Sequence, residues 1–157
     1  MTKKPKPPFH PQPITPPGIE EEMDPKPLYK AESYKPAGKL KNKVALISGG
    51  DSGIGRAVAL IFAREGADVA LVFLPEEKQD AEKIKQEIEA LGRKVLLIAG
   101  DLKTVEFCEK VVAETIKYFK KIDILVNNAS FQKHQPNLDA INFERFCRKK
   151  LSVQVSS

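Results

Sequence analysis

The chain has 157 residues, of which 41% are hydrophobic and 30% charged, a size and composition that suit one domain with a core and a wet surface. Its formal net charge of +5 lies at the two ends, because residues 41–140 hold fifteen basic and fifteen acidic residues, so we expect no specific nucleic-acid partner. No apolar run approaches the roughly 20 residues of a membrane helix, and the charged, proline-rich start is unlike a secretory signal.

Residues 1–40 contain ten of the twelve prolines of the chain. Proline supplies no N–H group and restricts its own φ, so neither a helix nor a sheet propagates through such a segment. We therefore expect an extended, proline-rich arm with polyproline II character. Disorder is the default expectation. The alternative is that the arm lies across a neighbouring subunit, anchored by Phe9, Ile14, Leu28, Tyr29 and Tyr34.

From Lys41 onward, short apolar runs alternate with amphipathic ones. The apolar runs predict strands at residues 44–48, 68–74, 94–99 and 122–126, and the amphipathic runs predict helices at 54–65, from 75 to about 91, and from 104 to about 120. The strands are continuous apolar runs, as expected for a parallel sheet that is covered on both faces. The order β-α-β-α-β-α-β predicts an α/β fold whose doubly wound sheet reverses its winding between the first and fourth strands, where a cleft should open.

Each predicted helix has one stripe of apolar residues that we expect to be buried. These stripes are Val58, Ile61 and Phe62 in the first helix; Ala81, Ile84, Ile88 and Leu91 in the second; and Val105, Cys108, Val112, Ile116 and Phe119 in the third. The cysteines at 108 and 147 and the two histidines stand alone in the sequence. Their spacing predicts no metal site and favours a reduced, cytoplasmic setting.

A glycine-rich turn joins the first strand to the first helix, with the spacing G-x-x-x-G-x-G. Gly49 lets the chain leave the strand, Gly53 removes a side chain where a phosphate approaches the backbone, and Gly55 lets the helix lie close to the sheet. The start of the helix adds unpaired N–H groups and the positive end of its dipole. Because the turn follows a strand and precedes a helix, nucleotide binding is favoured over a turn without a ligand.

Three motifs in chain order resemble the short-chain dehydrogenase/reductase family. Ser48-Gly49-x-x-x-Gly53-Ile54-Gly55 is similar to the family's T-G-x-x-x-G-I-G turn. Asp101-Leu102 after the third strand resembles the family's adenine-contacting Asp, and Asn127-Asn128-Ala129-Ser130 after the fourth resembles N-N-A-G. The resemblance covers about residues 40–140. The residues around the motifs also resemble those of a bacterial subgroup of general-stress-type oxidoreductases. It implies a Rossmann-like fold, here truncated after about four strands, and an NAD(P)-dependent oxidoreductase.

The resemblance also implies the residues of a dinucleotide site. The pyrophosphate would lie on Gly49, Ser52, Gly53, Ile54 and Gly55; adenine would lie on Asp101 and Leu102; the inner ribose would lie on Asn127 and Ala129, which also brace the sheet. A local carboxylate ahead of the third helix is an equal alternative for Asp101, and a turn amide is the favoured reading of Asn128. Ser130 departs from the family's glycine.

The cofactor form stays open between NAD and NADP. In this family an acidic residue at the end of the second strand usually accepts from the ribose 2′-hydroxyl and repels a 2′-phosphate. Leu74 stands at that position, no arginine is nearby, and the acids just beyond it, Glu76 and Glu77, are better explained as first-turn helix charges.

The residues that move protons during hydride transfer in this family have no counterpart in the sequence. The resemblance implies a serine and a Y-x-x-x-K pair beyond the fourth strand, but no tyrosine follows Tyr118. We therefore expect no catalytic residues and an inactive chain. It would be the amino-terminal half of a dehydrogenase, ended early by a stop or frameshift, with residues 141–157 as a basic, non-native tail.

Two other functions remain open at this point: a non-catalytic adenine-nucleotide-binding module, and an interaction protein that acts through the proline-rich arm. The early end also carries a structural expectation. The strand at 122–126 would become an unprotected apolar sheet edge, which favours association with other chains. The family's homo-oligomer should not assemble in the usual way, because its main interface helices would be missing.

Overall fold

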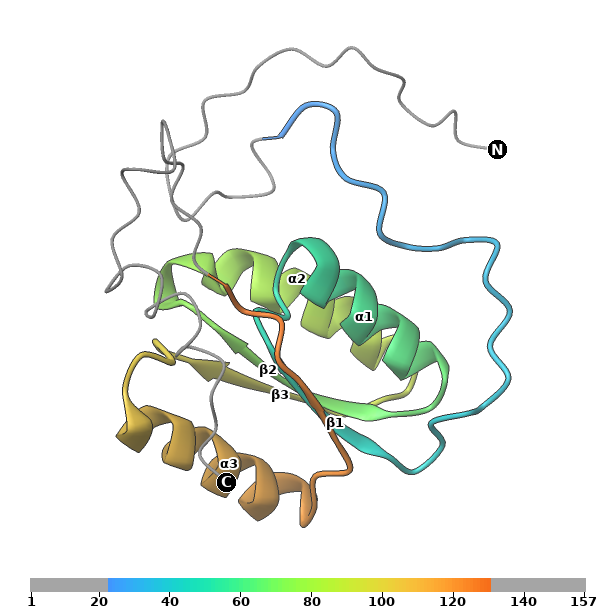
Figure 1. The fold of residues 1–157 in the computed structure, drawn as a ribbon. Coiled ribbons are helices and arrows are strands. Elements are labelled where there is room, and N and C mark those ends of the chain that lie inside the picture. The colour runs from blue at the N-terminus through green and yellow to red at the C-terminus, as the bar shows by residue number, and fades with distance from the viewer. Residues whose placement is uncertain (1–22, 131–157) are drawn as a thin grey trace, which may run out of the picture.

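A computed structural model of the protein describes residues 23–130, which form a four-stranded sheet with helices on both faces (Figure 1). Every pair of neighbouring strands is parallel. Helices α1 and α2 cover one face, and α3 covers the other. The elements in chain order are β1 (Val44–Ser48), α1 (Gly53–Arg64), β2 (Asp68–Phe73), the 3₁₀ helix η2 (Pro75–Glu77), α2 (Lys78–Glu89), β3 (Val95–Ala99), α3 (Val105–Phe119) and β4 (Ile124–Val126).

The sheet winds in two directions, as the sequence predicts. Its strand order is β3-β2-β1-β4, so the chain steps outward from β1 to β3 and then returns to the other side of β1. The α/β fold with a parallel, Rossmann-like sheet is therefore confirmed. The reversal places the carboxyl ends of β1 and β4 side by side, which is where sheets of this kind bind ligands.

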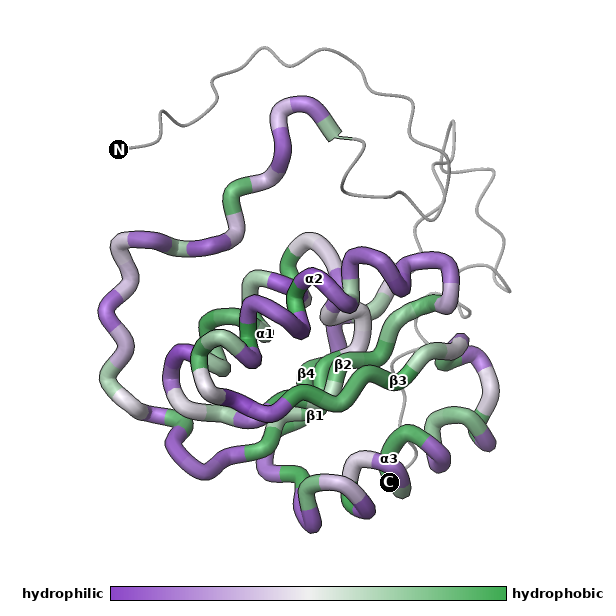
Figure 2. Tube along the Cα trace, turned by 180° about the vertical axis from the view of Figure 1, so that it is seen from behind, coloured by the Kyte–Doolittle hydropathy of each residue, from purple (hydrophilic) through white to green (hydrophobic). Residues whose placement is uncertain are grey.

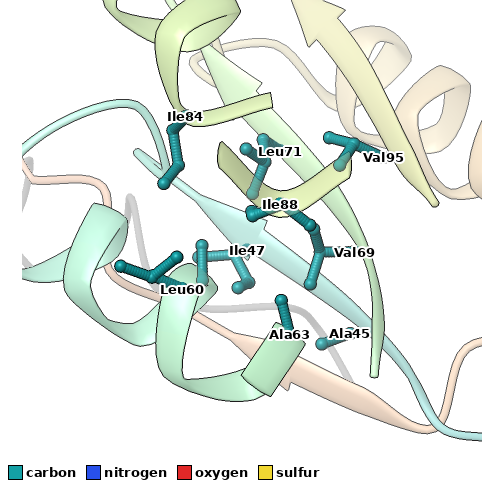
Figure 3. Packing of buried hydrophobic residues seen from close by; sticks show 10 residues of the cluster. Ala45, Ile47, Leu60, Ala63, Val69, Leu71, Ile84, Ile88 and Val95 are labelled. Carbon is teal, nitrogen blue, oxygen red and sulfur yellow. The ribbon is translucent and has the colours of Figure 1, made fainter. Parts of the chain in front are cut away.

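The strands bury both of their faces because they are continuous apolar runs. Residues 44–47 of β1 and 69–73 of β2 are all 5% exposed or less. On the α1 and α2 side, strand residues such as Ile47 and Leu71 pack against Leu60 and Ile84 (Figure 3). Figure 2 shows the same arrangement by hydropathy, with apolar strands at the centre and hydrophilic residues on the outer sides of α1 and α2.

The buried stripe of α2 agrees with the prediction except at its end, and that of α1 is shifted. Leu91 is 44% exposed because α2 ends at Glu89, before this residue. Apart from Arg56, the buried residues of α1 are small or lie one position away from the predicted stripe, namely Gly55, Ala59, Leu60 and Ala63. The predicted Val58, Ile61 and Phe62 are half-buried beside them. Small residues allow α1 to lie close to the sheet, which apolar periodicity does not reveal.

The predicted inward face of α3 is right at Phe119, which packs against the core, and wrong at three of its other positions. Val105, Val112 and Ile116 are 68%, 44% and 47% exposed. The side that packs on the sheet carries Val111 and Thr115, which are buried, with Phe107 and Phe119 beside them. This helix has apolar residues on two sides, and the sheet can cover only one of them.

β4 begins two residues later than predicted because a side chain replaces part of the strand ladder. The Asp123 carboxylate accepts the backbone amide of Val44 at 2.9 Å, and pairing with β1 starts only at Ile124. Among residues 23–130, β4 pairs with β1 alone and so lies at the sheet edge, with Leu125 52% exposed. The expected association through this edge stays a prediction, and a monodisperse monomer at high concentration in light scattering would contradict it.

The described part of the proline-rich arm, residues 23–40, lies against α1 and α2 of its own chain. The Tyr29 hydroxyl donates to Glu87 of α2 at 2.7 Å and accepts from Arg56 of α1, whose guanidinium carbon lies 3.7 Å from the centre of the Tyr29 ring. The expectation of disorder is therefore not met for this segment. Leu28, another predicted anchor, is 62% exposed. The predicted anchors Phe9 and Ile14, like the tail at 141–157, lie outside the described residues.

A second anchor holds the arm at the other end of α1. The Tyr34 hydroxyl donates to the carboxylate of Glu65, which is 3% exposed. The same carboxylate accepts the backbone amides of Ala37, at 3.2 Å, and Lys39, at 2.6 Å. These donors, the Tyr34 hydroxyl first, hold the pKa of Glu65 below its ordinary value.

We expect Tyr34→Phe to lower the melting temperature by a few degrees at about pH 7, because it removes a donor from a buried carboxylate. A carboxyl whose folded pKa is lowered stabilises the fold above its unfolded pKa, and that stability is lost as the pH falls through the folded value. The difference from wild type should therefore shrink below about pH 4. Circular dichroism melts at both pH values measure it.

Tyr118→Phe is the matched control, because the Tyr118 side chain is 53% exposed and its hydroxyl has no hydrogen bond within residues 23–130. Equal melting temperatures for the two variants at neutral pH would show that the second anchor contributes no stability.

Candidate functional site

The turn after β1 has the backbone that its glycines predict. Gly49 has φ +62° and Gly53 has φ +51°, both in the left-handed region that favours glycine. Gly49 also donates its amide to Val72 of β2 at 2.7 Å, which fixes the turn against the sheet. A Cβ added to Gly55 would lie 1.9 Å from the Gly49 oxygen. Gly49 and Gly53 are thus required by their positive φ, and Gly55 is required because no Cβ fits beside the Gly49 oxygen.

The turn leads directly into the N-terminus of α1. Ser52 is the N-cap residue, with φ −141°, and its carbonyl accepts the Arg56 amide at 3.0 Å. Among the described residues, the amides of Ile54 and Gly55 have no acceptor, and the first turn of α1 carries no acidic residue. The Ile54 side chain is 76% exposed. This helix end therefore offers donors and a positive dipole to an anion.

Ser48 and Asn128 tie the ends of β1 and β4 together. The Ser48 hydroxyl accepts the amides of Asn128 and Ala129 at 2.9 and 3.0 Å and donates to the Val126 carbonyl at 3.3 Å. The Asn128 side-chain amide donates to the carbonyls of Ser48, at 3.1 Å, and Gly49, at 2.9 Å. Asn128 is therefore the turn amide that we favoured. The bracing role of Ser48 was missed, although a hydroxyl at the strand end is its signal in the sequence.

The other residues predicted at this end differ in exposure. Asn127 is exposed, and Ala129 is half-buried. The Ala129 Cα would lie 3.2 Å from a Cβ added to Gly49, so these two backbones are close together. The structure thus brings the segment after β4 against the turn after β1.

We expect Asn128→Ala to destabilise the fold by about 1–3 kcal/mol, because it leaves two carbonyls without a donor and loosens β4 from the turn. Urea unfolding measures the change. Asn127→Ala is the neighbouring control, and its exposed side chain should change stability by less than about 0.5 kcal/mol. If both substitutions lower the free energy of unfolding equally, the Asn128 hydrogen bonds between β1 and β4 do not stabilise the fold.

Asp101 and Leu102 follow β3 on the same side of the sheet. The Asp101 carboxylate accepts the Lys103 amide at 3.1 Å and lies 2.9 Å from the Lys103 ammonium group, which together hold its pKa below the ordinary value. Its side chain is still 48% exposed. Thr104 caps α3 with its own hydroxyl, which accepts the Phe107 amide at 3.3 Å. The Asp101 carboxylate thus pairs with the neighbouring Lys103 and is still accessible from outside.

Asp51, inside the turn, was not singled out from the sequence. It is 1% exposed, and neither carboxylate oxygen has a hydrogen-bond partner among the described residues. Burial raises the pKa of its carboxyl to about 6, and the nearby negative charges of Glu77 and Asp80 add to this effect. The only sequence signal is an acidic residue within a run of glycines.

The described residues contain no group of three or more His, Cys, Asp or Glu side chains that could hold a metal ion. Among the helices of this part of the chain, none has the length and apolar character to cross a membrane. Cys108 lies in the first turn of α3, and its thiol donates to the Leu102 carbonyl at 3.4 Å. The positions of both histidines and of Cys147 lie outside residues 23–130.

Comparison with known proteins places this geometry in a family. The family model of short chain dehydrogenases matches residues 43–154. General stress protein 39 of Bacillus subtilis is 52% identical over 132 residues, which are 84% of this chain and 46% of that protein. The chain spans a little under half the length of the curated relatives that it matches.

Solved structures give the same result. A short chain dehydrogenase from Burkholderia cenocepacia, in complex with NADP, is 34% identical with a TM-score of 0.66, over 74% of this chain and 46% of that one. A blue fluorescent protein from a metagenomic library, in complex with NADPH, is 32% identical with a TM-score of 0.64, over 71% of this chain and 45% of that one. On its motifs, its fold and these matches, the chain belongs to the short-chain dehydrogenase family of oxidoreductases.

Proposed function

We propose that the domain binds an adenine dinucleotide, NAD or NADP, at the turn between β1 and α1. The observation that carries this proposal is the turn itself, in which Gly49 and Gly53 have positive φ and Gly55 lies against the Gly49 carbonyl. The turn faces the start of α1, where backbone donors and the helix dipole favour phosphate. Two solved relatives in complex with NADP and NADPH support the same ligand class.

The residues of the turn and of the neighbouring strand ends fit such a ligand. In this proposal the pyrophosphate is held by the turn residues, adenine by Asp101 and Leu102, and the inner ribose by Asn127 and Ala129. The glycines at 49 and 53 leave the backbone open, while the exposed Ile54 side chain can cover the ligand. A bound nicotinamide cofactor supplies the hydride that the family transfers.

We further propose that this chain by itself binds the cofactor without turning it over, as the amino-terminal half of an NAD(P)-dependent oxidoreductase. Proton exchange with a substrate oxygen needs a group such as a tyrosine of lowered pKa, and the sequence has no tyrosine after Tyr118. The arm segment 23–40 contacts its own α1 and α2, so it gives the interaction-protein alternative no support.

Titration of the full chain with NADH and NADPH by calorimetry tests the proposal. We expect saturable binding of at least one form and no turnover with simple aldehydes or alcohols. Gly53→Val should weaken binding by about ten-fold or more, because a β-branched side chain strains the left-handed backbone at φ +51° and crowds the phosphates.

Gly92→Val is the matched control for this substitution. Gly92 has φ +73°, and, like Gly53, it has nothing within 4 Å of an added Cβ. It lies just beyond α2, so the variant should lose comparable stability and keep its affinity for the cofactor. Absence of binding by the wild-type chain, or equal affinity of the two variants, would contradict dinucleotide binding at this turn.

A further inference from the structure

The first turn of α1, which holds the proposed phosphate site, is weak by its own composition. It starts at Gly53 and contains Gly55, and glycine is among the least favourable residues in a helix. Ser52 stands at the N-cap, but its side chain makes no capping hydrogen bond, whereas the hydroxyl of Thr104 caps α3. The glycines that leave room for a phosphate therefore leave this helix start dependent on other contacts.

One such contact comes from Arg56, which follows Gly55. Its amide donates to the Ser52 carbonyl at 3.0 Å and so closes the first turn of α1. The residue is 7% exposed, and its guanidinium lies 3.7 Å from the Glu87 carboxylate of α2. A cation near a helix N-terminus opposes the helix dipole, and burial adds to the cost of its charge. The position of Arg56 therefore depends on the groups that surround its side chain.

Tyr29 of the arm holds this side chain in place. The guanidinium carbon lies 3.7 Å from the centre of the Tyr29 ring, and the Tyr29 hydroxyl accepts from Arg56 and donates to Glu87 at 2.7 Å. The ring also packs against the hydrophobic core on the α1 and α2 side of the sheet. Tyr29, Arg56 and Glu87 thus form one cluster that joins the arm to the first turn of α1 and to α2.

We propose that Tyr29 is a positioning residue for nucleotide binding: through Arg56, the arm holds the first turn of α1 in the conformation that receives the phosphates. The inference rests on the proposed dinucleotide binding and gives the arm a part in it. A turn that is held in advance does not have to be ordered when the ligand binds, so the affinity is higher. In this role Tyr29 acts through Arg56 and not by contact with the ligand.

Tyr34 offers a matched comparison, because it attaches the same arm to the other end of α1. Its hydroxyl donates to Glu65, the C-cap residue of the helix. A helix of 12 residues is about 18 Å long, so this anchor lies far from the phosphate turn. Loss of the Tyr34 side chain should therefore destabilise the fold without disturbing the first turn of α1.

Calorimetric titration of the full chain with NADH and NADPH tests the proposal, at a temperature where circular dichroism shows every variant to be folded. We expect Tyr29→Ala to bind the form that wild type binds about five-fold or more weakly. Tyr34→Ala should bind like wild type, although both variants melt at lower temperatures. Tyr29→Phe keeps the ring on Arg56 and loses the hydroxyl, so its affinity should lie between those of wild type and Tyr29→Ala.

A double-mutant cycle tests whether Tyr29 acts through Arg56. Arg56→Gln should weaken binding by itself. Adding Tyr29→Ala to it should weaken binding little further, because the side chain that Tyr29 holds is already gone. Additive losses in the double variant would contradict the assignment.

Equal affinity of wild type and Tyr29→Ala, or equal losses in the two Tyr→Ala variants, would overturn the role of Tyr29 and leave dinucleotide binding intact. Higher affinity in Tyr29→Ala would overturn it too, since the arm would then keep Arg56 away from the phosphates. Failure of wild type to bind either NADH or NADPH would instead remove the proposed function, and this inference with it.

Discussion

Alanine in place of Gly55 is expected to cost at least about 3 kcal/mol of stability and to abolish cofactor binding. The added Cβ would lie 1.9 Å from the Gly49 oxygen, 2.6 Å from the Asn128 side-chain nitrogen and 2.8 Å from the Gly49 carbonyl carbon. Two of these obstacles are backbone atoms, and the third is the side chain that ties β4 to the turn. None can move without displacing α1 from the sheet or reshaping the turn.

Gly53→Ala separates this spatial conflict from backbone strain. Gly53 has φ +51°, but an added Cβ would meet nothing within 4 Å. Its alanine variant should therefore lose only about 1 kcal/mol. Urea unfolding measures stability, and titration with NADH measures binding. If the two alanine variants prove equally stable, the close approach of α1 to the turn is not what requires glycine at 55.

Asp51→Asn is expected to make the chain more stable above about pH 6, by about 1–3 kcal/mol. Burial raises the folded pKa of Asp51 from 3.8 to about 6, so the folded state holds its proton more tightly than the unfolded state does. Below the unfolded value the carboxyl is neutral in both states and costs little. Stability then falls as the pH rises from about 4 to about 6 and stays lower above this window. Asparagine cannot ionise, so the variant avoids this loss.

Urea unfolding at about pH 4 and about pH 8 measures the effect, and the two stabilities should differ clearly only at the higher pH. Asp101→Asn is a control of opposite sign, because Lys103 lowers the pKa of Asp101 and its ionised form is favoured by the fold. A variant at position 51 that is no more stable than wild type at pH 8 would show that the carboxylate is not held in an unfavourable environment.

The amino-acid sequence by itself determined the order of elements, the parallel sheet and the phosphate-type turn. These are local properties: continuous apolar runs make strands that are buried on both faces, and glycine is required where φ is positive or space is lacking, as at Gly49 and Gly55. The capping hydroxyl of Thr104 is another example, because its partner is three residues away. Such features can be predicted because cause and effect lie within a few residues.

Only the tertiary structure decided the features that join distant segments. Tyr29 meets Glu87, 58 residues away, and the Asp123 carboxylate takes an amide of β1 that is 79 residues away, which shortens β4. α3 has two apolar sides, and the position of the sheet selected the one with Val111. Asp51 is flanked by Gly50 and Ser52, yet its raised pKa comes from burial in the folded chain and from the charges of Glu77 and Asp80. Burial and electrostatic environment depend on neighbours in space, and sequence periodicity describes only neighbours along the chain.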